Sequence, residues 1–208
     1  MRTDEPSFNT RRSKWLLCAG VAFCALLMTI WPHGLTEFRY DRAGLAAGQL
    51  WRLLSAHLVH VNGAHLLLNV IGLFLIGELL WADLPLAHGA GLMLCSALGV
   101  AGFLWWFQPQ LIWYAGLSGV LHGLWAGCAL AGCWLRPPAL HSATRIVGGA
   151  GLALLLVKMT VEWHSGSPVQ TSHIIGAPVV TLAHLYGALV GAVYFLIWRI
   201  VESWRHRS

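Results

Sequence analysis

Ser118 and His184 are the residues of this sequence whose types and surroundings best suit covalent chemistry. Ser118 lies in Gly116-Leu-Ser-Gly119, where a polar turn gives way to an apolar segment that runs to about residue 135. The start of a helix offers free backbone N–H groups and a positive dipole end, which can stabilise a developing oxyanion. A serine nucleophile needs a base, and His184 in the last apolar segment is the best candidate.

A serine in a membrane helix is more often a packing residue, so its context decides the interpretation. A histidine inside a membrane span is costly, which favours a functional role. Both segments also carry small residues at a spacing of four, which keeps them on one helix face. These residues are Gly119, Gly123 and Gly127 in the earlier segment and Ala183, Gly187 and Gly191 in the later one. We therefore expect the two helices to approach closely beside Ser118 and His184.

Acidic residues that could orient His184 are not apparent from the sequence. Glu78 and Asp83 lie toward the cytoplasmic end of the second apolar segment, and Glu162 lies at the far end of the fifth. We therefore predict a Ser–His dyad rather than a triad. Lys158 and Glu162 are four residues apart, which predicts an ion pair near an interface.

Polar residues gather where the second apolar segment begins. His57, His60 and His65 could supply metal ligands, but no carboxylate or thiolate at matching depth completes a site, so no metal is predicted. His65 and Asn69 share a helix face, and their N–H groups could instead form an oxyanion hole. His122 lies one turn after Ser118 and competes with His184 as base. We expect His122 to support His184 by stacking or hydrogen bonding.

The composition indicates an integral membrane protein. The chain has 208 residues, of which 57% are hydrophobic and 10% charged, against roughly 25% charged residues in soluble domains. The net charge of +5 reflects topology in such a protein, so we expect no nucleic-acid partner. The five cysteines fall in apolar segments and are interpreted as packing residues. No cofactor is expected.

Six apolar segments predict an all-α bundle of six transmembrane helices in one membrane domain, residues 15–200. A cytoplasmic segment, 1–14, precedes it and a cytoplasmic tail, 201–208, follows it. The expected spans are 15–31, 64–81, 88–107, 118–135, 144–161 and 179–200. The first run has no small-residue cleavage site, so we expect a retained helix. The connection 33–62 is expected to lie in the membrane interface.

The distribution of positive charge predicts the orientation. The termini and the connection between the fourth and fifth spans carry most of the thirteen Lys and Arg residues, namely Arg2, Arg11, Arg12, Lys14, Arg136, Arg145, Arg199, Arg205 and Arg207. Both termini are therefore expected to be cytoplasmic. Ser118 then lies near the outer leaflet.

Several of these features together resemble the rhomboid intramembrane serine protease family. The matching strings are Trp51-Arg52, His60, His65-Leu-Leu-Leu-Asn69, Gly116-Leu-Ser-Gly119 and Ala183-His-Leu-Tyr-Gly187, in that order. The resemblance implies a six-transmembrane-helix rhomboid-like bundle with Ser118 as nucleophile and His184 as base. It also implies an oxyanion hole made by His60, Asn69 and the Ser118 backbone N–H. Supporting roles are implied for His65, His122, Gly116, Gly119, Gly187, Trp51 and Arg52.

One departure points to a subfamily. Many rhomboids have a tyrosine four residues after the serine, whereas this chain has His122. That string and the small size are similar to the rhombosortase subfamily. The resemblance implies processing of secreted proteins that end in Gly-Gly, an apolar helix and a basic tail. It places the protein in a Gram-negative inner membrane with its active site toward the periplasm. Its partners are then transmembrane substrates with a C-terminal anchor and the lipid bilayer, and both water and a lipid-derived amine remain possible acceptors.

Other functions remain open at this point. The chain could be a general rhomboid protease, or an inactive rhomboid-like protein that binds membrane clients without cutting them. The presence of both Ser118 and His184 counts against an inactive protein. A transporter of small polar solutes would need charged residues at the midplane and internal repeats, and the sequence shows neither convincingly.

Overall fold

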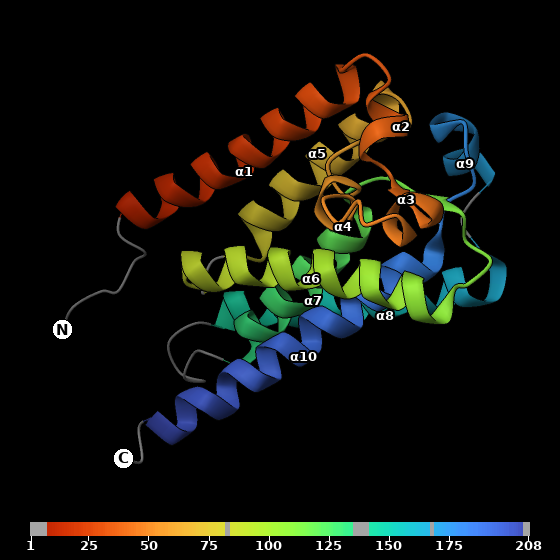
Figure 1. Ribbon diagram of the computed structural model, residues 1–208. Coiled ribbons are helices and arrows are strands. Elements are labelled where there is room, and N and C mark those ends of the chain that lie inside the picture. The colour runs from red at the N-terminus through yellow and green to blue at the C-terminus, as the bar shows by residue number, and fades with distance from the viewer. Residues whose placement is uncertain (1–7, 82–83, 135–141, 167–168, 206–208) are drawn as a thin grey trace.

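Six long helices form the body of the protein, whose computed structural model describes residues 8–81, 84–134, 142–166 and 169–205. They are α1 (Phe8–Ile30), α5 (Gly63–Leu79), α6 (Leu86–Phe107), α7 (Ser118–Trp134), α8 (Ser142–Ser165) and α10 (Thr181–Arg205). Helix α7 is the central element, because it contacts α5, α6, α8 and α10. Helix α1 packs on the outside, against α5 (Figure 1).

The protein is an integral membrane protein. Among the described residues, four helices are long and apolar enough to cross a membrane: α1, α6, α8 and α10. Helix α5 is a shorter apolar helix of 17 residues. Helix α7 also has 17 residues, about 26 Å at 1.5 Å per residue, and most of them are buried by its neighbours.

Each of the six predicted spans corresponds to one of these helices, with shifted ends. Helix α1 begins at Phe8, inside the segment that was expected to be a polar cytoplasmic extension. Helix α8 continues to Ser165 and α10 to Arg205. Residues 1–7 and 206–208 of the predicted terminal segments lie outside the described residues, as does Arg136. Helix α1 begins and α10 ends on the same side of the molecule (Figure 1).

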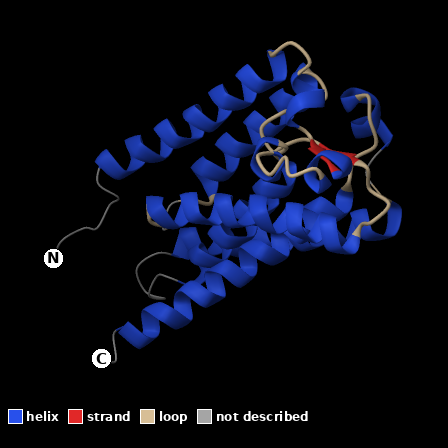
Figure 2. Cartoon of the chain, in the orientation of Figure 1, coloured by secondary structure: helices blue, strands red, loops and turns tan. Residues whose placement is uncertain are grey.

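The connection between α1 and α5 is folded, rather than being one interfacial segment. It contains the short helices α2 (Gly34–Phe38), α3 (Arg42–Ala46) and α4 (Arg52–Ser55) and the strand β1 (Tyr40–Asp41). Strand β1 pairs antiparallel with β2 (Trp113–Tyr114), so that Tyr40 lies opposite Tyr114. The strand pair and the last short helix, α9 (Val169–Ile175), lie at the end of the bundle opposite the start of α1 (Figure 2).

Arginine side chains hold this connection together. The Arg52 guanidinium donates to the carbonyl oxygens of Thr36 (3.0 Å) and Arg39 (2.8 Å), and Arg42 donates to the last carbonyls of α6, including that of Leu104 at 3.0 Å. Free carbonyls at a helix end need such donors. Arg52 is therefore a structural residue of the connection, whereas its neighbour Trp51 is 55% exposed.

The predicted glycine contact between α7 and α10 is present, except that Gly127 faces Leu92 of α6 instead of α10. A Cβ placed on Gly187 would overlap the carbonyl oxygen of Gly119, and one on Gly191 would overlap that of Gly123. Only hydrogen fits at these positions, so the two backbones touch directly. We call the contact formed by Gly119, Gly123, Gly187 and Gly191 the glycine seam. It joins the first two turns of α7 to the N-terminal half of α10 and thereby positions the residues described next.

Candidate active site

Ser118 and His184 lie within hydrogen-bonding distance. Ser118 is the first residue of α7 and His184 is the fourth residue of α10. The Ser118 hydroxyl oxygen and His184 Nε2 are 2.9 Å apart. His184 is buried, while Ser118 is partly exposed. A hydroxyl in contact with an imidazole nitrogen at a helix start is the arrangement that nucleophilic catalysis requires.

A carboxylate contacts the other nitrogen of His184, and the prediction that no acidic residue reaches this histidine is wrong. Glu162 Oε2 lies 2.8 Å from His184 Nδ1, and both side chains are buried, with 7% and 6% exposed. Glu162 is one turn from the end of α8. Since α8 is antiparallel to α7 and α10, its last turn lies beside their first turns. The predicted contact between Lys158 and Glu162 is also present and uses Oε1 of the same carboxylate.

His122 stacks on His184 instead of competing with it. The two rings are 4.1 Å apart and within 12° of parallel. His122 Nδ1 donates to the carbonyl oxygen of Ser118 at 2.7 Å, one turn back along α7. This bond directs the His122 ring edge toward the helix backbone, so the side chain presents its face to His184. His122 Nε2 is buried and has no hydrogen-bond partner.

The ring stack does not suit a metal ion. His122, Glu162 and His184 each offer a ligand atom within 4.8 Å of the others. A metal ion lies in the plane of each imidazole that binds it, because the nitrogen lone pair lies in that plane. Two parallel rings that are stacked at 4.1 Å share no such point. The geometry therefore fits a hydrogen-bonded catalytic group better than a ligand set.

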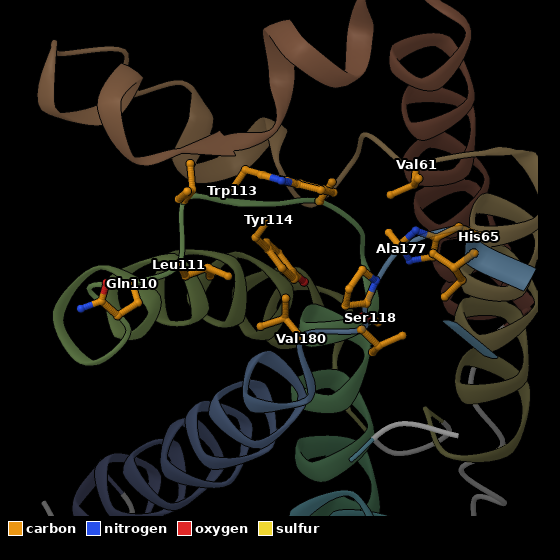
Figure 3. A pocket seen from close by; sticks show the side chains of 14 residues that line it. Val61, His65, Gln110, Leu111, Trp113, Tyr114, Ser118, Ala177 and Val180 are labelled. Carbon is orange, nitrogen blue, oxygen red and sulfur yellow. The ribbon is translucent and has the colours of Figure 1, made fainter. Parts of the chain in front are cut away.

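A cavity of about 300 Å³ opens beside Ser118. It is lined by both residues of β2, by the segment that leads into α10, including Ala177 and Val180, and by His65 (Figure 3). Most of this lining is apolar. An extended apolar or small-residue segment could enter it and place a carbonyl group near the Ser118 hydroxyl.

Two buried polar groups on α5 lack hydrogen-bond partners. His65 Nδ1 and Asn69 Nδ2 have no hydrogen-bond partner, and both residues lie on the buried face of α5. Burying such a group unpaired costs about 1–3 kcal/mol. His65 lines the cavity beside Ser118, and Asn69 lies one turn further along the same helix face.

His60 was expected to donate to the oxyanion, but both of its ring nitrogens already have other hydrogen-bond partners. Its Nδ1 donates to the carbonyl oxygen of Leu58 at 2.9 Å, and its Nε2 accepts from the backbone N–H of Leu117 at 3.4 Å. Burial lowers the pKa of His60 to about 3, so the ring is neutral and has one N–H. That N–H is already used. His60 holds the backbone before Ser118, and His65 is the histidine that lines the cavity.

Gly116 allows the close approach between this turn and His65. Its φ of +117° disfavours residues with a side chain, and a Cβ there would lie 2.5 Å from His65 Cε1. Its N–H donates to the carbonyl of Ala56 and its carbonyl accepts from the Tyr114 hydroxyl, at 2.8 and 2.7 Å. The turn that leads into Ser118 is therefore fixed from both sides.

Comparison with known families identifies this fold. The family model of the Rhomboid domain matches residues 47–200. This chain belongs to the rhomboid family. The match begins before α4 and ends within α10, so it includes every residue of the site described above and leaves α1 outside. No curated protein matches the chain. Rhomboid membership suggests intramembrane proteolysis with membrane proteins as substrates.

Proposed function

We propose that this rhomboid is an intramembrane serine protease in which Ser118 is the nucleophile and His184 the general base. The observation that carries the proposal is the 2.9 Å contact between the Ser118 hydroxyl and His184 Nε2 beside an apolar cavity. The surrounding helix seam and ring stack hold the pair in this geometry. Serine hydrolysis of this kind needs no cofactor.

The reaction begins when the Ser118 oxygen attacks a substrate carbonyl carbon. As the C–O bond forms, the hydroxyl proton passes to His184 Nε2 and the carbonyl electron pair moves to oxygen. His184 then returns that proton to the leaving amine as the C–N bond breaks, which leaves an acyl-enzyme on Ser118. Water, or an amine, attacks the ester, and the same two proton transfers in the opposite order regenerate Ser118.

The oxyanion is stabilised by the Ser118 backbone N–H together with His65 and Asn69. The N–H groups of the first helical turn have no partner within the helix. The unpaired nitrogens of His65 and Asn69 supply further polar contacts. Removal of one such donor in other serine proteases costs about 10²- to 10³-fold in kcat.

The substrate class follows the rhombosortase resemblance. We propose that the enzyme cuts secreted proteins near a Gly-Gly segment that precedes a C-terminal membrane helix with a basic end. Glycine costs roughly 1 kcal/mol per residue in a helix relative to alanine, so a Gly pair unwinds easily and exposes a carbonyl. His122 at the position where many rhomboids carry tyrosine supports the subfamily assignment. The acceptor is then water or a lipid-derived amine.

The proposed location is the inner membrane of a bacterium, with both termini cytoplasmic and Ser118 toward the periplasm. The distribution of Lys and Arg residues supports this orientation. Because α1 begins and α10 ends on one side of the bundle (Figure 1), an even number of crossings is consistent with it. An inactive client-binding rhomboid is the competing function, and a reactive serine distinguishes the two.

Labelling with a fluorophosphonate probe tests the proposed activity. Purified wild-type protein is expected to form a covalent adduct on Ser118, and Ser118→Ala is expected to form none. Folding of both proteins is compared by circular dichroism and thermal unfolding in the same detergent. Equal labelling of the two proteins, or no labelling of a folded wild-type protein, would contradict the assignment of Ser118.

A second experiment tests the substrate. A secreted reporter carries a C-terminal tail of Gly-Gly, an apolar helix and a basic end, and the matched control replaces Gly-Gly by Leu-Leu. Co-expression is expected to release the Gly-Gly reporter at least tenfold faster, because the leucine pair stabilises the helix around the scissile bond. Equal release of both tails would instead indicate a general rhomboid protease.

A further inference from the structure

The contacts around His184 extend to α8. They form a chain from Ser118 to His184, then to Glu162 and Lys158. His184 uses Nε2 toward the Ser118 hydroxyl and Nδ1 toward Glu162 Oε2, at 2.9 and 2.8 Å. The Lys158 ammonium binds the second carboxylate oxygen, Oε1. Each oxygen of Glu162 therefore has its own partner, and each partner is a nitrogen group.

We propose that Glu162 is the positioning residue of a Ser–His–Glu triad and that Lys158 sets which oxygen of Glu162 faces His184. This proposal rests on the proposed protease activity and extends it to two residues of α8. An ionised carboxylate can only accept hydrogen bonds, so it requires a proton on His184 Nδ1. Nε2 is then the acceptor, and this is the tautomer that can take a proton from Ser118.

No proton is transferred to Glu162 at any step of the reaction in this triad. When the Ser118 oxygen bonds to the substrate carbon, its proton moves to His184 Nε2 and the ring becomes an imidazolium. The Nδ1–H remains on the ring and donates to Glu162, whose negative charge stabilises the cation across 2.8 Å. The Nε2 proton later leaves with the amine. The carboxylate is unchanged throughout.

Other groups near His184 cannot replace Glu162 as the acceptor of the Nδ1–H hydrogen bond. His122 faces His184 from α7 through its ring and has already given its Nδ1–H to the carbonyl of Ser118. His65 on α5 lines the cavity on the side of Ser118. Apart from Glu162, the charged group that faces the pair is Lys158, which can only donate. Glu162 is thus the one acceptor shown at His184 Nδ1 among the described residues.

Substitution of Glu162 by glutamine gives a specific expectation because of Lys158. The ammonium needs an oxygen, so the amide oxygen of Gln would face Lys158 and the NH2 group would face His184. That group donates, which forces Nδ1 to accept and moves the ring proton to Nε2. His184 could then no longer accept the Ser118 proton. We expect kcat to fall by about 10²- to 10⁴-fold with KM within about threefold of wild type.

The same reasoning predicts the relative kcat values of three further variants. In Glu162→Ala, a water molecule can accept from His184 Nδ1, so the loss in kcat should be at least tenfold smaller than in Glu162→Gln. In the double variant Glu162→Gln/Lys158→Met, the amide is free to turn its oxygen toward His184, and at least tenfold of the lost kcat should return. Lys158→Met alone leaves the carboxylate in place and should stay within about tenfold of wild type.

A purely structural role for Glu162 predicts the opposite order, which makes the comparison decisive. An isosteric glutamine would then be milder than alanine, and loss of Lys158 in addition would never restore activity. Arg199→Met is the matched control for Lys158→Met, because it breaks an ion pair with Glu202 at 2.6 Å elsewhere on α10. Its kcat should remain at the wild-type value.

The measurement is steady-state cleavage of a fluorogenic transmembrane substrate in proteoliposomes, with thermal unfolding of each variant as a folding check. A kcat for Glu162→Gln within threefold of wild type overturns the triad, as does a loss in Glu162→Ala larger than in Glu162→Gln. Failure of the double variant to regain activity overturns the role of Lys158. If Glu162→Gln does not fold, the comparison of Glu162→Ala with Lys158→Met decides: equal kcat values overturn the proposal, and a deficit confined to Glu162→Ala supports it. Loss of the proposed function itself would look different, because wild type would then neither cleave substrate nor be labelled at Ser118.

Discussion

The glycine seam makes a quantitative prediction, because a single methyl group should separate α7 from α10. A Cβ on Gly187 would overlap the Gly119 carbonyl oxygen and lie 2.8 Å from its carbon, whereas real Cβ atoms essentially never approach within 3.0 Å. Both neighbours are backbone atoms and cannot rotate away. Relief requires a displacement of the helices on the order of 1 Å, and misplacement of that size costs about 10²-fold in rate. Overpacking adds a loss of about 1–3 kcal/mol in the free energy of unfolding.

The substitution Gly187→Ala is measured against two controls. Gly102→Ala in α6 has nothing within 4 Å of its added Cβ and should keep wild-type kcat and stability. Gly119→Ala should fall between the two, because its Cβ would meet the Ala183 carbonyl oxygen at 3.0 Å. The assay is cleavage of a fluorogenic transmembrane substrate in proteoliposomes, with thermal unfolding in detergent. Wild-type kcat in Gly187→Ala would refute the claim that backbone contact between α7 and α10 sets the distance from Ser118 to His184.

Two further predictions concern the roles of the histidines and the orientation. His184→Ala should reduce cleavage to the background level of Ser118→Ala. His122→Ala should retain more than a hundredth of the wild-type kcat, because the His122 ring supports the base without exchanging a proton. The reverse order of the two variants would make His122 the base. A reporter enzyme fused after Ser165 should be active outside the cytoplasm and one fused at the C-terminus should be active inside, and an external C-terminus would contradict the six-span topology.

The sequence predicts the helices well because each of them meets a simple physical requirement. A segment that crosses hydrocarbon has to be apolar and long, and this requirement is visible in composition without any knowledge of the neighbours. The glycine seam is predictable for a similar reason, since a spacing of four on one face is a property of a single helix. Helix ends are less predictable, and the start of α1 at Phe8 illustrates this, because polar residues can continue a helix into the interface.

The folded connection between α1 and α5 is not visible in the same way. Its short helices and the pairing of Tyr40 with Tyr114 depend on contacts between segments far apart in the sequence. Neither strand is long enough to show an alternating pattern, because each has two residues. Arg42 and Arg52 are stabilised by carbonyl oxygens of other elements, and a sequence does not show which carbonyls lack donors.

The contact between Glu162 and His184 is not apparent from residue spacing, although the alternating direction of the spans favours it. The sequence predicts that successive spans run in opposite directions, so the end of the fifth and the starts of the fourth and sixth lie at the same membrane depth. Glu162 lies one turn from the end of α8, and Ser118 and His184 lie in the first turns of α7 and α10. Distance along the chain therefore does not measure the difference in membrane depth between two residues. The predicted ion pair with Lys158 uses one oxygen of the carboxylate, and the other oxygen can accept a hydrogen bond from His184.

His60 and His65 show a limit of motif matching. Both fit a histidine at the start of the second membrane helix, and the sequence alone does not show that the backbone N–H of Leu117 occupies Nε2 of His60. The structure separates the two by their partners, since His60 uses both ring nitrogens and His65 Nδ1 has none. A residue that is to bind a transient charge needs an unused donor, so accounting for hydrogen bonds distinguishes histidines that residue type does not.

The two sides of Ser118 differ in how fully their polar groups are paired, and this difference fits the proposed reaction. His184 is held by Glu162 on one nitrogen, by the Ser118 hydroxyl on the other and by His122 across its face, so the base has its working geometry before any substrate arrives. His65 and Asn69 instead keep unpaired nitrogens. A group that stabilises only the transition state gains by having no partner in the resting protein, because no bond has to be broken when the oxyanion forms. The cost of leaving these donors unpaired, about 1–3 kcal/mol each, is then recovered when the oxyanion binds them.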